Sequence, residues 1–290
     1  MNQTSDTGHQ TPAMNRTGLY IALAVGLITG VVFGFYPELD IKITSMFYDA
    51  SAKSFPISHL TWAKVAREAA MWVTWAFVLP SMVALIVKLA WPVRPLMMSG
   101  RKMAFLLVTI FLTAIVLTNI VFKGYWGRPR PVAVTQFNGA LEFKPWWDPT
   151  GLCPKNCSFF SGEGGTAFWT YAPAALAPPQ WRAAAYVAAT AFGIATGGLR
   201  IAFGGHFTTD VIASGVVSFI VVWLAYAFIF RWPATRMSDW DIDAWLTRVV
   251  WPGYRWRQKL FGRDVGATPT MRHVPHSTRA DSPAAAGNVL

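Results

Sequence analysis

Three short groups of polar residues in this chain have the types and the spacing that phosphoryl chemistry uses. They are Lys123-x6-Arg130-Pro131, Ser161-Gly162-Glu163 and Arg200-x5-His206-x3-Asp210. Lysine and arginine bind phosphate oxygens, and serine and free backbone amides add hydrogen bonds. Histidine is a nucleophile that a carboxylate can orient. Each group also has an ordinary structural explanation, so their common location decides whether they form a site.

The first group lies in the segment KGYWGRPRP. A lysine at a helix end can simply reach the lipid headgroups, which would explain Lys123 alone. It does not explain two arginines held between proline and glycine, because proline fixes the backbone and glycine permits a tight turn. We therefore expect Lys123 and Arg130 to bind phosphoryl oxygens, with Arg128 as a weaker candidate.

The second group precedes an apolar run. Ser161 can be a helix N-cap, and the same geometry offers a hydroxyl and free backbone N–H groups, at Gly162 and beyond, to an anion. Glu163 can stabilise the helix dipole from the first turn. It can also donate a proton to a leaving group, provided that burial raises its pKa.

The third group joins a histidine to a carboxylate. His206 and Asp210 are four residues apart, which lets them face each other on a helical turn. A carboxylate bonded to one ring nitrogen fixes the tautomer and leaves the other nitrogen free to attack. Asp210 can also be an N-cap of the apolar run that follows it. We expect Arg200 to bind the anion that His206 attacks.

The composition indicates a membrane protein. Of 290 residues, 53% are hydrophobic and 13% are charged, whereas soluble domains carry about 25% charged residues. Spanning a bilayer takes about 20 apolar residues. Such runs occur at Gly18–Tyr36, Ala69–Val87, Met103–Phe122, Ala183–Leu199 and Val211–Phe230, with a shorter one at Gly164–Ala177. The sequence predicts an all-α integral membrane bundle of six transmembrane helices, of which the fourth is the weakest.

The charge pattern sets the orientation. Net charge is +11, but no soluble basic domain carries it, so we expect no nucleic acid partner. Basic residues concentrate between the second and third spans and after the sixth, which places these segments in the cytoplasm. Both termini are then cytoplasmic, and segments 37–68, 123–163 and 200–210 are external. All three polar groups therefore lie in catalytic loops on the outer face.

The remaining segments divide the chain. We expect a disordered cytoplasmic tail at 1–17, the six-helix domain at 18–230, a basic amphipathic cytoplasmic segment at 231–263 and a disordered tail at 264–290. Within the basic segment, 238–251 predicts a helix resting on the inner leaflet and ended by Pro252. Cys153 and Cys157 lie in an external loop, where they can form a disulfide or stay free thiols.

Taken together, the three groups resemble the signature of the type-2 phosphatidic acid phosphatase superfamily, KxxxxxxRP, PSGH and SRxxxxxHxxxD. Here the segments read KGYWGRPRP, FSGE and LRIAFGGHFTTD, within residues 18–230. The resemblance implies a lipid phosphatase that needs no metal or cofactor and forms a phosphohistidine. His206 would attack phosphorus and Asp210 would orient it. The phosphoryl oxygens would be held by Lys123, Arg130, Ser161, Gly162 and Arg200.

The chain departs from the signature at three positions. Phe160 replaces proline and Leu199 replaces serine, which we expect to be mild changes. Glu163 stands where the superfamily has the histidine that protonates the leaving group. We expect Glu163 to take the acid role with a raised pKa, which would give an acidic pH optimum and a large loss of activity in Glu163→Gln.

The resemblance also bounds the substrate and the location. It implies a membrane lipid phosphate as partner, at the periplasmic face of a bacterial inner membrane. Candidates are lipid A phosphate, which we favour, undecaprenyl pyrophosphate, and phosphatidylglycerol phosphate or phosphatidate. A phosphotransferase that passes the group to another lipid would use the same first step. A non-catalytic headgroup binder is the alternative that the Glu163 substitution raises. The oligomeric state is unknown from the sequence.

Overall fold

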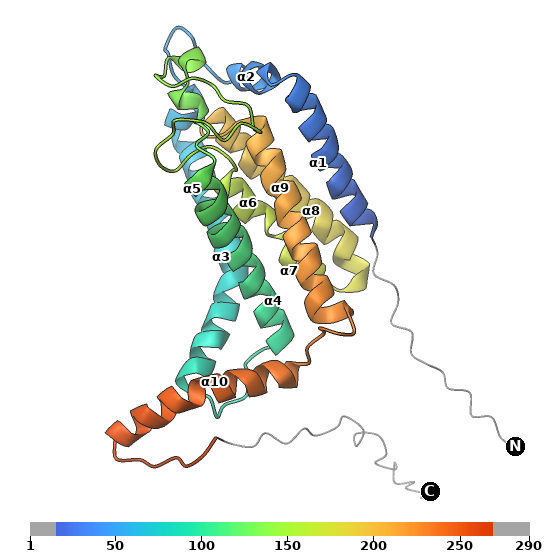
Figure 1. Ribbon diagram of the computed structural model, residues 1–290, viewed down its shortest axis with the longest axis vertical. Helices are drawn as coiled ribbons and strands as arrows, with labels where there is room; N and C mark the ends of the chain where they lie inside the picture. The colour runs from blue at the N-terminus through green and yellow to red at the C-terminus, as the bar shows by residue number, and fades with distance from the viewer. Residues whose placement is uncertain (1–15, 269–290) are drawn as a thin grey trace, which may run out of the picture.

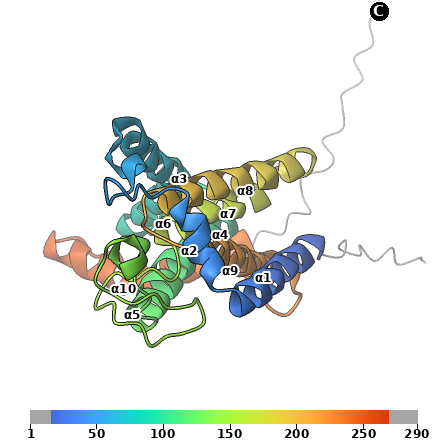
Figure 2. The same ribbon diagram turned by 90° about the horizontal axis from the view of Figure 1, so that it is seen from above.

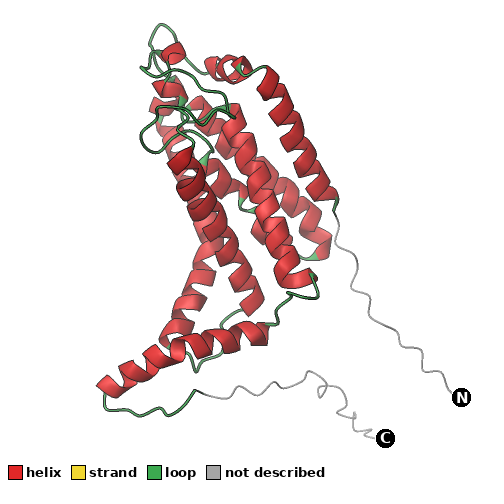
Figure 3. Cartoon of the chain, in the orientation of Figure 1, coloured by secondary structure: helices red, strands yellow, loops and turns green. Residues whose placement is uncertain are grey.

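Every regular element in the described part of the chain is a helix. The structure is a computed structural model that describes residues 16–268 (Figure 3). The predicted all-α class is confirmed. Nearly all of the predicted tail at 1–17 and most of the tail at 264–290 lie outside the described residues.

Five helices are long and apolar enough to cross a membrane, and they run along one common direction (Figure 1). The third of them continues from an α-helical start through a π-helical stretch, and the fifth ends in a π-helical turn. These helices are α1 (Thr17–Phe35), α3 (Thr61–Ala90), α4 (Gly100–Ile110) continued by Phe111–Phe122 and α5 (Lys123–Tyr125), α8 (Pro179–Ala202), and α9 (Thr208–Tyr226) continued by Ala227–Arg231.

The fourth predicted span is not one long helix. It folds as two short helices, α6 (Gly162–Phe168) and α7 (Tyr171–Ala175), joined at Trp169 and Thr170. Both pack in the middle of the bundle against α8 and α9 (Figure 2), and Trp169 is fully buried. A break in a helix leaves backbone N–H and C=O groups without helical partners. Within the hydrocarbon region of a membrane, such a break is tolerated only where protein surrounds it. Within residues 16–268, five candidate spans therefore replace the six expected.

The loops that carry the polar groups gather at one end of the bundle. The short helix α2 (Glu38–Ser45) lies across this end and contacts the start of α9 (Figures 1 and 2). The neighbouring segments at this end of the bundle contain short 3-10 turns at Pro56–His59, Pro131–Ala133 and Thr135–Phe137. This end of the molecule therefore presents irregular backbone that is fixed by packing.

The opposite end is closed by α10 (Asp239–Leu260), which crosses the bundle axis (Figure 1). Ser238 and Asp241 form the expected capping box. The helix does not end at Pro252, as the sequence predicted, but runs through it. Two anchors hold α10 against the bundle: buried Lys88 pairs with Asp243 at 2.6 Å, and Arg257 donates to the backbone of α3 beyond the proline.

This arrangement predicts that the loop end and α10 face opposite sides of a membrane. Glu142→Cys and Phe261→Cys place a thiol at exposed positions at the two ends, 80% and 74% exposed. In intact spheroplasts, a membrane-impermeant maleimide should label one variant and not the other, and permeabilisation should make both reactive. Labelling of both variants from the same side would contradict the arrangement.

Candidate active site

The three polar groups converge at the loop end, although up to 87 positions separate them (Lys123 to Asp210). Lys123 closes the third long helix, Ser161 caps α6, and Arg200 lies in the last turn of α8. Asn156 joins two of the cations: its side-chain oxygen accepts from Lys123 Nζ at 3.1 Å and from Arg130 Nη2 at 2.8 Å. The expected phosphate-binding residues are thus brought together.

Two glycines make room for these cations. A Cβ on Gly162 would lie 3.0 Å from Lys123 Nζ, and a Cβ on Gly205 would lie 2.4 Å from Arg200 Nη2. Either side chain would push a cation out of place. Arg200 Nε is buried and makes no hydrogen bond to the described residues. Ser161, by contrast, uses its hydroxyl to accept from Gly164 N at 3.2 Å.

Glu163 is held by two arginines. Arg67 of α3 donates to both carboxylate oxygens, with Nη2 to Oε1 at 2.6 Å and Nε to Oε2 at 2.8 Å. Arg200 Nε lies 3.6 Å from Oε2. Burial acts to raise the pKa of Glu163, but the hydrogen bond from Arg67 and the charges of both arginines outweigh it and lower the pKa. This direction is opposite to the raised pKa that the acid role needs.

His206 is oriented by a backbone carbonyl. Its Nδ1 lies 2.7 Å from the oxygen of Ser158, while the nearest Asp210 oxygen is 3.7 Å away. Since a carbonyl oxygen can only accept, Nδ1 carries the proton, and in the neutral ring Nε2 keeps its lone pair. The ring therefore has the tautomer expected of a nucleophile, although the direct hydrogen bond is not the predicted one to Asp210.

Asp210 instead organises the surroundings of His206. Its Oδ2 accepts from Ser158 Oγ at 2.5 Å and from Phe207 N at 2.8 Å. Asp210 is therefore not the N-cap of α9, as the sequence suggested: Phe207 is the N-cap, and Asp210 bonds back to it from the third helical position. Its Oδ1 accepts from Arg128 Nη1 at 2.5 Å. Asp210 and Arg128 are both fully buried. The hydrogen bond of His206 thus runs through Ser158, a residue that Asp210 fixes.

Arg128 does not belong to the phosphate-binding group. Besides Asp210, it donates to Asp40 Oδ2 at 2.8 Å and to the backbone oxygen of Lys144 at 2.9 Å. Its guanidinium also stacks over the ring of Phe207. Each of its three nitrogens therefore donates to protein, and because the side chain is fully buried, a substrate oxygen cannot reach it.

Sequence reasoning missed four residues of this site, namely Asp40, Arg67, Asn156 and Ser158. Each lies outside the local motifs and reaches the site through the fold. The loop that carries Asn156 is fixed by the Cys153–Cys157 disulfide that the structure contains and by backbone contact between Gly127 and Gly151. Gly127 has φ of +64°, and a Cβ there would lie 2.3 Å from the Gly151 oxygen.

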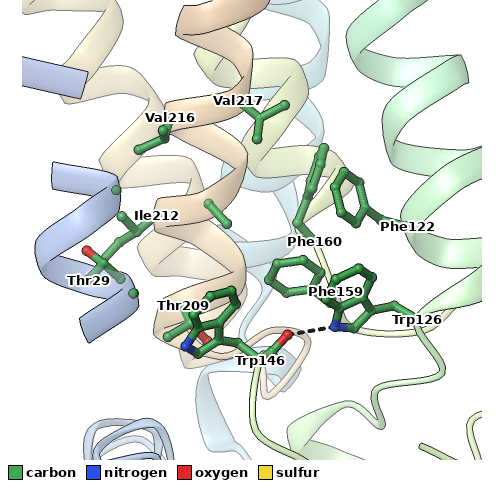
Figure 4. A pocket seen from close by; sticks show the side chains of 13 residues that line it. Thr29, Phe122, Trp126, Trp146, Phe159, Phe160, Thr209, Ile212, Val216 and Val217 are labelled. Carbon is green, nitrogen blue, oxygen red and sulfur yellow. Dashed lines mark hydrogen bonds between the residues drawn. The ribbon is translucent and has the colours of Figure 1, made fainter. Parts of the chain in front are cut away.

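Beside the segment from Ser158 to Ser161 lies an apolar cavity of about 250 Å³. Phe159 and Phe160 line it from one side, and Thr29 on α1 and Val216 on α9 from the other (Figure 4). Trp126 and Trp146 also line it, and Trp126 Nε1 donates to the backbone oxygen of Trp146 at 2.6 Å. The two phenylalanines separate Ser158 from Ser161, so one short segment faces the cavity with its rings and the polar site with its serines.

The arrangement suits transfer of a phosphoryl group. Four cationic side chains lie near the Glu163 carboxylate and beside a histidine with a free ring nitrogen, namely Lys123, Arg67, Arg130 and Arg200. A dianion supplies the charge that this cluster lacks, and arginine and lysine hydrogen bonds match its oxygens. A nucleophile next to preorganised positive charge is the arrangement that stabilises a phosphoryl transition state.

Burial predicts that His206 is neutral near pH 7. Desolvation lowers its pKa below the ordinary 6.5, with Asp210 opposing the shift and Arg130 and Arg200 adding to it. A lowered pKa means that the ring loses its proton at a lower pH and stays a nucleophile through neutrality. NMR of protein with ¹⁵N-labelled histidine should show the His206 resonance, assigned with His206→Ala, titrating below pH 6.5. A midpoint at or above 6.5 would contradict the burial.

Comparison with known proteins agrees with this geometry. Residues 102–234 match the PAP2 superfamily, the type-2 phosphatidic acid phosphatases. A protein named lipid A 4'-phosphatase from Francisella tularensis subsp. novicida (strain U112) is 32% identical over 226 residues, covering 75% of this chain and 98% of that protein. One of the same name from Rhizobium leguminosarum is 30% identical over 210 residues, covering 66% and 87%. No solved structure matches the chain.

The family match extends over all three polar groups, and 98% and 87% of the two relatives are covered. The region that matches the family begins at residue 102, in the first turn of α4, and includes Lys123, Ser161 and His206. The chain belongs to the PAP2 superfamily.

Proposed function

We propose that the protein removes a phosphate group from lipid A at the periplasmic face of a bacterial inner membrane, through a phosphohistidine at His206. Membership of the superfamily makes the chain a lipid phosphatase, a hydrolase. The observation that carries the finer proposal is the hydrogen bond from His206 Nδ1 to the Ser158 carbonyl, which leaves Nε2 free beside the cations.

In the proposed first step, His206 Nε2 attacks phosphorus while Lys123, Arg130 and Arg200 bind the three non-bridging oxygens. A P–N bond forms, the P–O bond to the lipid breaks, and the lipid alkoxide takes up a proton from water. This proton is balanced by the one that the attacking water loses in the second step. The ring becomes cationic as the bond forms, and the carboxylate of Asp210, 3.7 Å from Nδ1, stabilises that charge. Water then attacks phosphorus, the P–N bond breaks, and inorganic phosphate leaves.

The amide N–H groups at the start of α6, beginning at Gly162, complete the proposed phosphate pocket. Ser161 supports it by capping this helix and by donating its backbone N–H to the backbone carbonyl oxygen of Asp210 at 3.2 Å. In this proposal the positive charge comes from side chains and needs no metal.

The periplasmic location is supported by the distribution of charge between the two ends. Basic residues gather on and beside α10, at the end away from the site, and Lys and Arg favour the cytoplasmic side. In the labelling experiment above, Glu142→Cys should therefore be the variant labelled in intact spheroplasts. Labelling of Phe261→Cys alone would reverse the orientation. Lipid A as the substrate is supported by the names of the related proteins.

Phosphate release from single lipids tests the function. Purified protein should release inorganic phosphate from lipid A faster than from undecaprenyl pyrophosphate, phosphatidylglycerol phosphate or phosphatidate. His206→Ala should abolish release, because the nucleophile is removed. His59→Ala, an exposed histidine at the same end of the molecule, is the matched control and should keep wild-type activity. Equal release from His206→Ala and wild type would exclude the mechanism, and consumption of lipid without free phosphate would indicate a transferase.

Glu163→Gln separates two roles of this residue. Its lowered pKa favours a carboxylate that orders Arg67 and Arg200 over a proton donor. Losing a general acid costs about 10²–10⁴-fold, and the loss is largest for poor leaving groups. We expect a smaller loss in Glu163→Gln, of equal size for an alkyl phosphate and for p-nitrophenyl phosphate. A loss of activity confined to the alkyl phosphate would contradict this expectation and would indicate that Glu163 is the general acid.

A further inference from the structure

We propose that Asp40 is a positioning residue for His206, acting through Arg128 and Asp210. Asp40 belongs to none of the three sequence groups and comes from α2, which precedes the second long helix. The proposal rests on the proposed function, because it assigns Asp40 to the histidine step of that reaction.

Both oxygens of Asp40 are engaged inside the protein. Oδ1 accepts from Thr209 N at 3.0 Å, and Oδ2 accepts from Thr209 Oγ1 at 2.5 Å and from Arg128 Nη2 at 2.8 Å. The side chain is 1% exposed. A buried charge is retained at a cost in desolvation unless its partners are fixed. Asp40 thus ties α2 to the first turn of α9, in which Asp210 also lies.

A continuous set of contacts leads from Asp40 to the imidazole. Arg128 bridges Asp40 and Asp210, Asp210 accepts from the hydroxyl of Ser158, and the carbonyl of Ser158 accepts from His206 Nδ1. Arg128 Nη1 also donates to Thr209 Oγ1 at 2.7 Å, which closes a ring with Asp40. The orientation of Ser158, and hence the tautomer of His206, depends on where Arg128 holds Asp210.

Asp40 also affects the charge that His206 experiences. Burial raises the pKa of Asp40, and the charge of Arg128 and the hydrogen bonds from Thr209 and Arg128 oppose this shift. In its ionised form, Asp40 adds a second carboxylate to one guanidinium and leaves a net negative charge, whereas Arg128 alone would neutralise Asp210. His206 becomes cationic when it is phosphorylated, so this charge stabilises the transition state more than the ground state. The phosphate is bound by Lys123 and Arg200, which do not contact Asp40. Loss of Asp40 should therefore lower kcat and leave KM unchanged.

The first test compares Asp40→Asn with Glu38→Gln, using the lipid phosphate that the wild type hydrolyses fastest. Glu38 is an exposed carboxylate on the same helix, so its variant loses the same charge without touching the network. We expect kcat to fall about 10–100-fold in Asp40→Asn with KM unchanged, as for other groups that orient a reacting side chain. Glu38→Gln should match the wild type. Wild-type kcat in Asp40→Asn, or a change in KM alone, would overturn the proposal.

The second test changes no charge and adds a measurement that does not depend on turnover. Thr209→Val keeps the shape and removes the hydroxyl that accepts from Arg128 and donates to Asp40, while the direct ion pair between Asp40 and Arg128 remains. Its kcat should fall with KM unchanged, and ¹⁵N NMR should show His206 as a mixture of tautomers instead of the Nδ1–H form. If Asp40→Asn fails to fold, wild-type kcat and tautomer in Thr209→Val would overturn the proposal. If the wild type releases no phosphate, the proposed function fails, while the tautomer measurement still tests Asp40.

Discussion

The site depends on one buried cation, Arg128, which no water reaches and which two carboxylates share. Removing one member of such a set leaves an uncompensated charge and costs about 3–5 kcal/mol. Arg128 also joins separate parts of the chain, because its partners come from α2, from the loop at Lys144 and from the start of α9. The loops at this end are irregular in backbone, and this ion-pair network ties them to one another.

The second constraint is an excess of positive charge beside that network. Asn156 is uncharged, so its hydrogen bonds with Lys123 and Arg130 leave both positive charges uncompensated. Glu163 carries one negative charge against the two positive charges of Arg67 and Arg200. Positive groups this close together repel one another, so the rest of the fold must hold them in place. A bound anion would reduce this repulsion. The glycines at 162 and 205 keep the cations close, since a side chain at either position would displace them.

Much of this organisation could be predicted from the sequence, because it depends on local patterns. The apolar runs predicted the long helices. The position of each motif at the end of such a run predicted that Lys123, Arg130, Arg200 and His206 lie at one end. The broken fourth segment could not be foreseen, since its apolar composition fits a span and only its burial among other helices permits the break. Asp40 and Arg67 could not be foreseen either, because each reaches the site through tertiary contacts across 88 and 96 positions.

The segment from Ser158 to Ser161 is the boundary between two solvents. On one side it meets ionised groups, and on the other its phenylalanine rings line a space as apolar as hydrocarbon. If this segment rotated about its axis, the phenylalanine rings would face the charged groups and the serine hydroxyls would face the apolar cavity. Both changes cost free energy. Amphipathicity over four residues thus does for this loop what a regular hydrogen-bond ladder does for a helix: it fixes which way each side chain points.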